Sequence, residues 1–132
     1  MTVYVDTSAF LAVLDADDQN HGDAKRVWES LLSKRVPLIA SSYVLVETWA
    51  LVQHRLGIEA VRSFSEDVFP LLGIIWVGSD LHRRGVAALL AANRRNLSLV
   101  DCVSFEVMRD LGVKNVFTFD PHFREHGFTC MP

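Results

Sequence analysis

Thr2-Val3-Tyr4-Val5-Asp6-Thr7-Ser8-Ala9-Phe10 is the stretch that decides the fold of this chain. It predicts a short apolar strand at residues 2–5 that ends on an acid and turns at once into a helix. Such a strand is typical of a buried sheet, and open α/β folds place their ligands at the carboxyl edge of that sheet. Asp6 is therefore a candidate site residue, although an acid at this position also serves as a helix cap.

Short apolar runs alternate with longer amphipathic stretches along the rest of the chain. This βαβα rhythm predicts an α/β fold with a mostly parallel sheet covered by helices on both faces. Neither a linker nor an internal repeat interrupts the rhythm, so we expect a single domain over residues 1–132. Further strands are expected at residues 38–40, 73–77, 115–119 and 128–131, and the main helices at 8–14, 21–33, 42–56, 58–69, 79–95 and 98–112.

Composition places the chain among folded globular proteins. Half of its 132 residues are hydrophobic and 22% are charged, with a formal net charge of -3. That charge argues against binding nucleic acid by bulk attraction alone, although bound divalent cations would offset it. The two cysteines lack the spacing of a metal site or a disulfide framework. With no secretory signal and no apolar run of the roughly 18 residues that span a membrane, we expect a cytoplasmic protein.

Three further acids occupy positions similar to that of Asp6. Asp120 ends an apolar strand, and Asp101 lies in the first turn of a predicted helix. Glu47 lies in the first half of a helix that is apolar on nearly every side. Strand carboxyl ends and the amino-terminal halves of the following helices share one edge of a parallel sheet. All four acids can therefore converge on that edge.

Each acid taken alone has a simpler structural role. Asp101 fits a capping box with Ser98, Asp120 fits a helix cap, and Glu47 fits a narrow solvated stripe. Four carboxylates in one cleft, however, repel one another and raise one another's pKa values. A hard cation relieves this repulsion, and Mg²⁺ or Mn²⁺ suits an oxygen-only site that acts on phosphate. No Gly-rich phosphate loop, Gly-x-Ser-x-Gly elbow or His-Glu-x-x-His motif offers another catalytic set.

Four motifs in order resemble those of the PIN-domain nucleases. They are Val5-Asp6-Thr7-Ser8-Ala9-Phe10, Glu47 in a Ser-Ser-x-x-x-x-Glu helix, Ser-Leu-Val-Asp-Cys-Val-Ser-Phe at 98–105, and Phe-Thr-Phe-Asp-x-x-Phe at 117–123. The chain length and the final Phe-x-x-x-Gly-Phe are similar to those of VapC-type toxins of type II toxin–antitoxin pairs. The resemblance implies a three-layer α/β/α sandwich and divalent-metal-dependent cleavage of single-stranded RNA.

The resemblance also implies roles and partners. Carried over by position, the residues that hold Mg²⁺, or Mn²⁺ in its place, would be Asp6, Asp101, Glu47 and Asp120. Asp6 and Asp101 would be the principal ligands. Glu47 would bind the ion directly or through water, and Asp120 would complete the site. Ser8 and Ser104 would orient ligands or water, or else remain ordinary hydroxyls near helix starts. The implied partners are an RNA substrate, a cognate antitoxin that occupies the cleft, and a second copy in a homodimer.

The helix predicted at residues 79–95 carries four arginines in two equally spaced pairs. Arg83 and Arg94 are eleven residues apart, which returns them to within about 20° of one helix face. Arg84 and Arg95 repeat that spacing. The pattern predicts either contacts with RNA phosphates or a solvated outer face.

Two other functions are consistent with the same residues. One is an RNA-processing nuclease of the same fold that has no antitoxin, which the absence of a small neighbouring antitoxin reading frame would indicate. The other is a non-catalytic interaction domain whose acids bind magnesium. Such a domain would bind the ion without degrading RNA.

Overall fold

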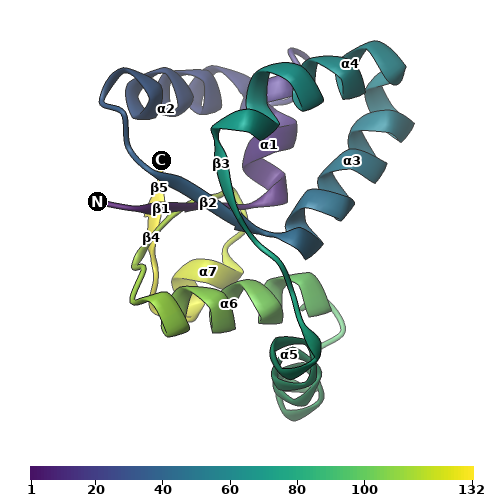
Figure 1. The fold of residues 1–132 in the computed structure, drawn as a ribbon, viewed down its shortest axis with the longest axis vertical. Coiled ribbons are helices and arrows are strands. Elements are labelled where there is room, and N and C mark those ends of the chain that lie inside the picture. Colours follow the sequence, from purple (N-terminus) through teal and green to yellow (C-terminus); the bar gives the residue numbers. More distant parts are fainter.

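Five parallel strands form the centre of the computed structural model, which describes residues 1–132 (Figure 1). Their order across the sheet is β3-β2-β1-β4-β5, and every neighbouring pair is parallel. The strands are β1 (Val3–Val5), β2 (Leu38–Ser41), β3 (Leu72–Ile75), β4 (Asn115–Phe117) and β5 (Thr129–Met131). The predicted α/β class and the parallel sheet are therefore confirmed.

Helices cover both faces of this sheet, as a three-layer α/β/α sandwich requires. Figure 1 shows one face covered by α1 (Thr7–Leu14), α2 (His21–Ser33), α3 (Ser42–Leu56) and α4 (Ile58–Ser63). The other face is covered by α6 (Leu99–Leu111) and α7 (His122–Glu125), and α5 (Ser79–Ala92) packs against the outside of α6. None of these helices has the length and apolar character needed to cross a bilayer.

The middle strand β1 is completely buried. Val3, Tyr4 and Val5 have no exposed surface, as expected for a strand that helices cover on both sides. The phenol oxygen of Tyr4 lies 2.7 Å from Ser104 Oγ and accepts a hydrogen bond from the backbone N–H of Ser41 at 3.1 Å. Tyr4 thus ties α6 and the carboxyl end of β2 to the strand that carries the first acid. Full burial of each valine contributes roughly 1.5–3 kcal/mol to folding.

Two predicted helix ends are wrong, and each has a local cause. Helix α5 ends at Ala92, earlier than predicted, because Asn93 adopts the left-handed conformation (φ 50°) that terminates helices. The helix predicted at 58–69 is α-helical only to Ser63 and continues as a π turn and a 3-10 turn. Pro70, which has no N–H to donate to the carbonyl one turn earlier, lies in the final 3-10 turn, where the helical segment ends.

Candidate active site

The four predicted acids meet at the carboxyl edge of the sheet, beside the point where the strand order reverses. From β1 the chain adds β2 and β3 on one side and then β4 and β5 on the other. Open α/β sheets bind ligands at such a reversal. Asp6 follows β1, Asp101 lies in the first turn of α6, Glu47 lies on α3, and Asp120 follows β4. All four line one cleft of about 420 Å³.

Asp6 is the most deeply buried of these acids, with 4% of its surface exposed. Its Oδ2 accepts hydrogen bonds from Ser8 Oγ at 2.8 Å and from Thr118 Oγ1 at 3.0 Å. It also caps α1 by accepting the backbone N–H of Ser8 at 3.4 Å. Burial is the main cause that raises the pKa of Asp6 to about 6, and the charges of Asp101 and Asp120 act in the same direction. The hydroxyl donors oppose this shift.

The hydroxyls of Ser8 and Thr118 also hold the loop after β4. Ser8 Oγ accepts the backbone N–H of Phe119 at 2.9 Å, and Thr118 Oγ1 accepts that of Asp120 at 2.9 Å. Phe119 therefore bonds to a side chain rather than across the sheet, and β4 ends at Phe117 instead of at the predicted residue 119. Ser8 thus lies against Asp6 and the loop that carries Asp120, where a supporting role was predicted.

Asp101 is both a helix cap and part of the cleft. Its backbone N–H donates to Ser98 Oγ at 3.1 Å, and its Oδ2 accepts the backbone N–H of Ser98 at 3.1 Å. The capping box considered from the sequence is therefore present. Burial raises the pKa of Asp101, with a further contribution from the charge of Asp120, while the Ser98 donors lower it. Only 8% of Asp101 is exposed.

The remaining two acids are less enclosed. Asp120 is half-buried, and its Oδ1 accepts the backbone N–H of His122 at 2.9 Å, which holds the carboxylate at the start of α7. Glu47 is also half-buried and makes neither a hydrogen bond nor an ion pair with the protein. Its side chain is therefore free to move within the cleft.

The three aspartates share one pattern of bonding. In each, one carboxylate oxygen accepts hydrogen bonds from the chain, namely Oδ2 of Asp6, Oδ2 of Asp101 and Oδ1 of Asp120. No protein group donates to the other oxygen. Carboxylates held in place with one free oxygen each, two of them with pKa values that burial raises, fit a hard divalent cation. The donor set agrees with the predicted ion, and its identity remains a prediction.

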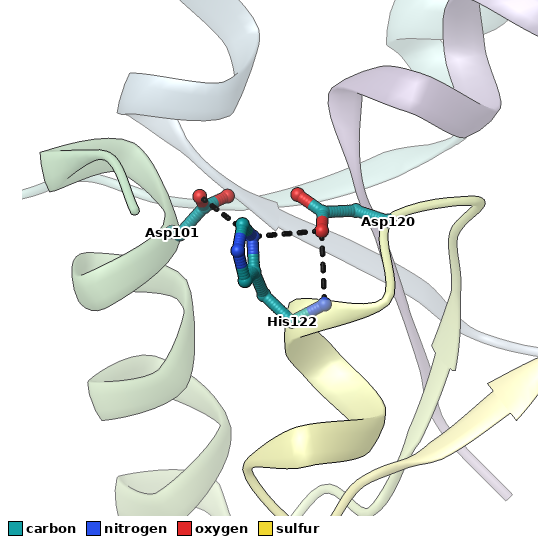
Figure 2. A group of neighbouring side chains, drawn as sticks. All are labelled: Asp101, Asp120 and His122. Atoms are coloured by element: carbon teal, nitrogen blue, oxygen red, sulfur yellow. Dashed lines mark hydrogen bonds and ion pairs between the residues drawn. The ribbon is translucent and has the colours of Figure 1, made fainter. Parts of the chain in front are cut away.

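Several residues of this region, among them Phe119, were not predicted from the sequence. Thr118 supports Asp6, and Arg55 on α3 lines the cleft. His122 is buried, with Nδ1 2.9 Å from Asp120 Oδ1 and 3.9 Å from Asp101 Oδ2 (Figure 2). Arg55 follows Glu47 by eight residues on α3, which turns it about 80° around the helix, so the spacing alone does not identify it.

Ser104 and the four arginines lie away from the cleft lining. Ser104 donates to the Val100 carbonyl at 2.9 Å and meets Tyr4, so its contacts are with the core. Arg84 pairs with acids on α5 and α6, and Arg94 pairs with Glu125 at 2.9 Å. The two arginines that form no ion pair are Arg83 and Arg95. Because α5 ends at Ala92, the four do not form the continuous helical stripe that was predicted.

Comparison with known proteins places this site in context. A family model described as the PIN domain matches residues 3–129. The chain is 36% identical over 127 residues to the 23S rRNA-specific endonuclease VapC20 of Mycobacterium tuberculosis, a match that covers 96% of this chain and 95% of that protein.

Solved structures agree with this match. The crystal structure of VapC20 from Mycobacterium tuberculosis, described as a toxin that cleaves the sarcin-ricin loop, has a TM-score of 0.86 and 34% identity over 97% of each chain. VapBC2 from Rickettsia felis, bound to a DNA fragment from its promoter, gives a TM-score of 0.71 at 15% identity over 98% of this chain and 97% of that chain. FitAcB from Neisseria gonorrhoeae gives 0.72 at 12% identity over 99% and 97%. The last two comparisons show the fold alone.

Proposed function

This chain belongs to the PIN-domain family, and on that premise we propose that it is a divalent-metal-dependent endoribonuclease and the toxin of a toxin–antitoxin pair. The observation that carries the proposal is the set of four clustered carboxylates, three of them aspartates that each keep one oxygen free of protein donors. The 36% identical relative acts on 23S rRNA. Ribosomal RNA is therefore the first substrate class to test.

The roles of the four acids follow from their surroundings. Asp6 and Asp101 are the most buried of the four, and the chain donates a hydrogen bond to one oxygen of each, so they suit the principal ligands of Mg²⁺ or Mn²⁺. Asp120 is held by one backbone N–H and completes that side, while the unbonded Glu47 can reach an ion directly or through water. When bound, such an ion lowers the pKa of a water nucleophile and neutralises charge on the phosphate.

The cleft also offers contacts to an RNA strand. Arg55 is the one cation among the residues that line it, and it pairs with none of the acids there. A guanidinium without a protein partner suits a backbone phosphate. Phe119 lines the same cleft and is half-buried, so its ring suits an unpaired base, which supports the preference for single-stranded RNA. Arg83 and Arg95 remain predicted phosphate contacts outside the cleft.

We extend the proposal to two protein partners, an antitoxin that covers the cleft and a second copy of the chain. Two large apolar side chains support a protein contact beside the cleft-forming helix α3. Trp76 is 70% exposed and Val46 is 65% exposed. The backbone N–H of Val77 donates to Ser42 Oγ at 2.9 Å, which places the segment after β3 next to α3. Loss of dimer in solution on Trp76→Ser would support a homodimer through this face.

The decisive experiment uses the purified protein with defined RNAs. A 23S rRNA transcript and an unrelated transcript are incubated with Mg²⁺, with Mn²⁺ and with a chelator, beside the Asp6→Asn variant. We expect discrete cleavage of rRNA by the wild type only when a divalent ion is present, and none by the variant. Ion binding without cleavage of any RNA would favour the non-catalytic interaction domain instead.

A further inference from the structure

His122 lies directly against two of the four acids, although it does not line the cleft. It is the second residue after Asp120 and the first residue of α7. Only 8% of the residue is exposed. Figure 2 shows its imidazole between Asp101 of α6 and Asp120 of the loop after β4. The ring therefore lies between α6 and the loop after β4.

The polar edge of the ring is buried without a well-aligned partner. Nδ1 lies 2.9 Å from Asp120 Oδ1 and 3.9 Å from Asp101 Oδ2, yet it is the one buried side-chain nitrogen or oxygen without a hydrogen-bond partner. The two facts agree if the N–H points between the carboxylates rather than straight at Oδ1. A lone pair at Nδ1 would face two negative oxygens, so Nδ1 carries the hydrogen in this arrangement.

The oxygens that face His122 are those already bonded to the chain. Asp120 Oδ1 accepts the backbone N–H of His122, and Asp101 Oδ2 accepts the backbone N–H of Ser98. The other two oxygens, Asp101 Oδ1 and Asp120 Oδ2, point toward one another in Figure 2. The imidazole thus lies beside the oxygens that the chain already holds, Asp101 Oδ2 and Asp120 Oδ1. The second oxygen of each carboxylate is left to the cleft.

We propose that His122 is a positioning residue for the divalent cation, because its buried Nδ1–H holds the Asp101 and Asp120 carboxylates with one oxygen of each turned toward the cleft. The inference rests on the proposed metal-dependent function and deepens it. A carboxylate that rotates freely loses entropy when it binds an ion, whereas a fixed one does not. His122 therefore sets how tightly the ion is bound, without touching the ion.

The variants test whether an N–H at the position of Nδ1 is enough, or whether the imidazole ring itself is needed. His122→Asn places an amide nitrogen at the same distance along the side chain as Nδ1, His122→Gln places it one carbon farther, and His122→Leu removes it. His126→Leu is the matched control, because His126 follows α7 and stacks on Phe105, 4.2 Å between ring centroids. Melting temperatures establish that each variant is folded.

Manganese affinity, measured by the electron paramagnetic resonance signal of free Mn²⁺, gives the main readout. We expect affinity about 10–100-fold weaker in His122→Leu and His122→Gln, and within about threefold of wild type in His122→Asn and His126→Leu. RNA cleavage by His122→Leu should recover at high Mn²⁺ with an unchanged KM for RNA. Pulsed resonance of bound Mn²⁺ should show no coupling to a coordinated nitrogen.

Each outcome has one meaning. Wild-type affinity in folded His122→Leu would overturn the role of His122 and leave the metal-dependent nuclease intact. A nitrogen coupling that disappears in His122→Leu would also overturn it, because His122 would then be a ligand. Equal weakening by His122→Asn and His122→Leu would contradict the importance of the N–H position. A wild-type protein that binds no divalent ion would overturn the proposed function itself.

Discussion

The two ends of α6 hold acids in opposite circumstances. In its first turn, Asp101 shares a cleft with the other three predicted acids, with Asp18 of the loop after α1, and with a single arginine, Arg55, that pairs with none of them. In its last turn, Asp110 lies 2.7 Å from Arg84, which also contacts Glu106 at 3.3 Å. The hydrogen bond from Arg84 lowers the pKa of Asp110, whereas burial and the charge of Asp120 raise the pKa of Asp101.

This difference separates charge that the fold neutralises from charge that it leaves for a ligand. Around Arg84, three acids on α5 and α6 surround one guanidinium, and the result is an exposed cluster that joins two helices. In the cleft, hydrogen bonds fix the three aspartates in place but supply no opposite charge. Folding therefore disfavours ionisation of Asp101 at the start of α6 and favours ionisation of Asp110 at its end. The cleft, and not the cluster around Arg84, therefore suits a bound cation.

The largest expected effect comes from removing one charge at each end of α6. Asp101→Asn should lower the rate of RNA cleavage about 1,000-fold, because a ligand of the ion loses its charge, while its oxygen can still accept from Ser98. Asp110→Asn should leave the cleavage rate unchanged and lower the melting temperature slightly. Initial rates at saturating Mg²⁺ and thermal unfolding measure the two effects. Equal loss of cleavage in both variants would show that fold damage, and not ion binding, is responsible.

The next largest effect concerns stability without the ion. The pKa of Asp6 rises from 3.8 to about 6 on folding, so its favourable contribution is complete below pH 3.8 and is lost as pH rises through 6. The metal-free wild type should therefore gain stability between pH 7.5 and pH 5. Asp6→Asn should be about 1–3 kcal/mol more stable than the wild type at pH 7.5, with a smaller gain on acidification.

Chemical denaturation at the two pH values, in the presence of a chelator, measures this gain. Added Mg²⁺ should stabilise the wild type more than the variant, which reverses the order. A variant that is less stable than the wild type at pH 7.5 would show that Asp6 acts mainly as a helix cap.

The sequence predicts the acids better than it predicts their environment. Asp6, Asp101 and Asp120 could be placed because strand ends and helix starts in a parallel sheet share one edge. His122 could not be placed, because its role depends on α7 packing against α6 rather than on local pattern. The arginine pattern had the same weakness. Its spacing is that of one helix face, but Asn93 ends the helix before Arg94 and Arg95, and acids distant in the sequence pair with Arg84 and Arg94.

A smaller effect is expected from cations that lack a partner. Arg55→Gln should weaken binding of single-stranded RNA about 3–10-fold and reduce the salt dependence of binding by about one ion, because one phosphate contact is lost. Arg83→Gln tests the outer surface of α5 in the same assay, since Arg83 is exposed and unpaired. Affinities are measured at several salt concentrations with the inactive Asp101→Asn background, so that the RNA stays intact. A flatter salt dependence in Arg83→Gln alone would place the RNA over α5 instead of along the cleft.

The smallest expected effect, and the sharpest contrast with the cleft, comes from Arg84→Gln. The guanidinium joins α5 to α6, so its loss should lower the melting temperature by a few degrees at low salt and by less at high salt, because exposed pairs are screened. RNA affinity and its salt dependence should not change, since this charge is already neutralised by Asp80, Glu106 and Asp110. Lys25→Gln is the control for loss of one positive charge without loss of an ion pair, because Lys25 is an exposed residue of α2 that pairs with no acid. If Arg84→Gln weakened RNA binding as much as Arg55→Gln does, pairing within the fold would not distinguish structural charge from ligand-binding charge in this protein.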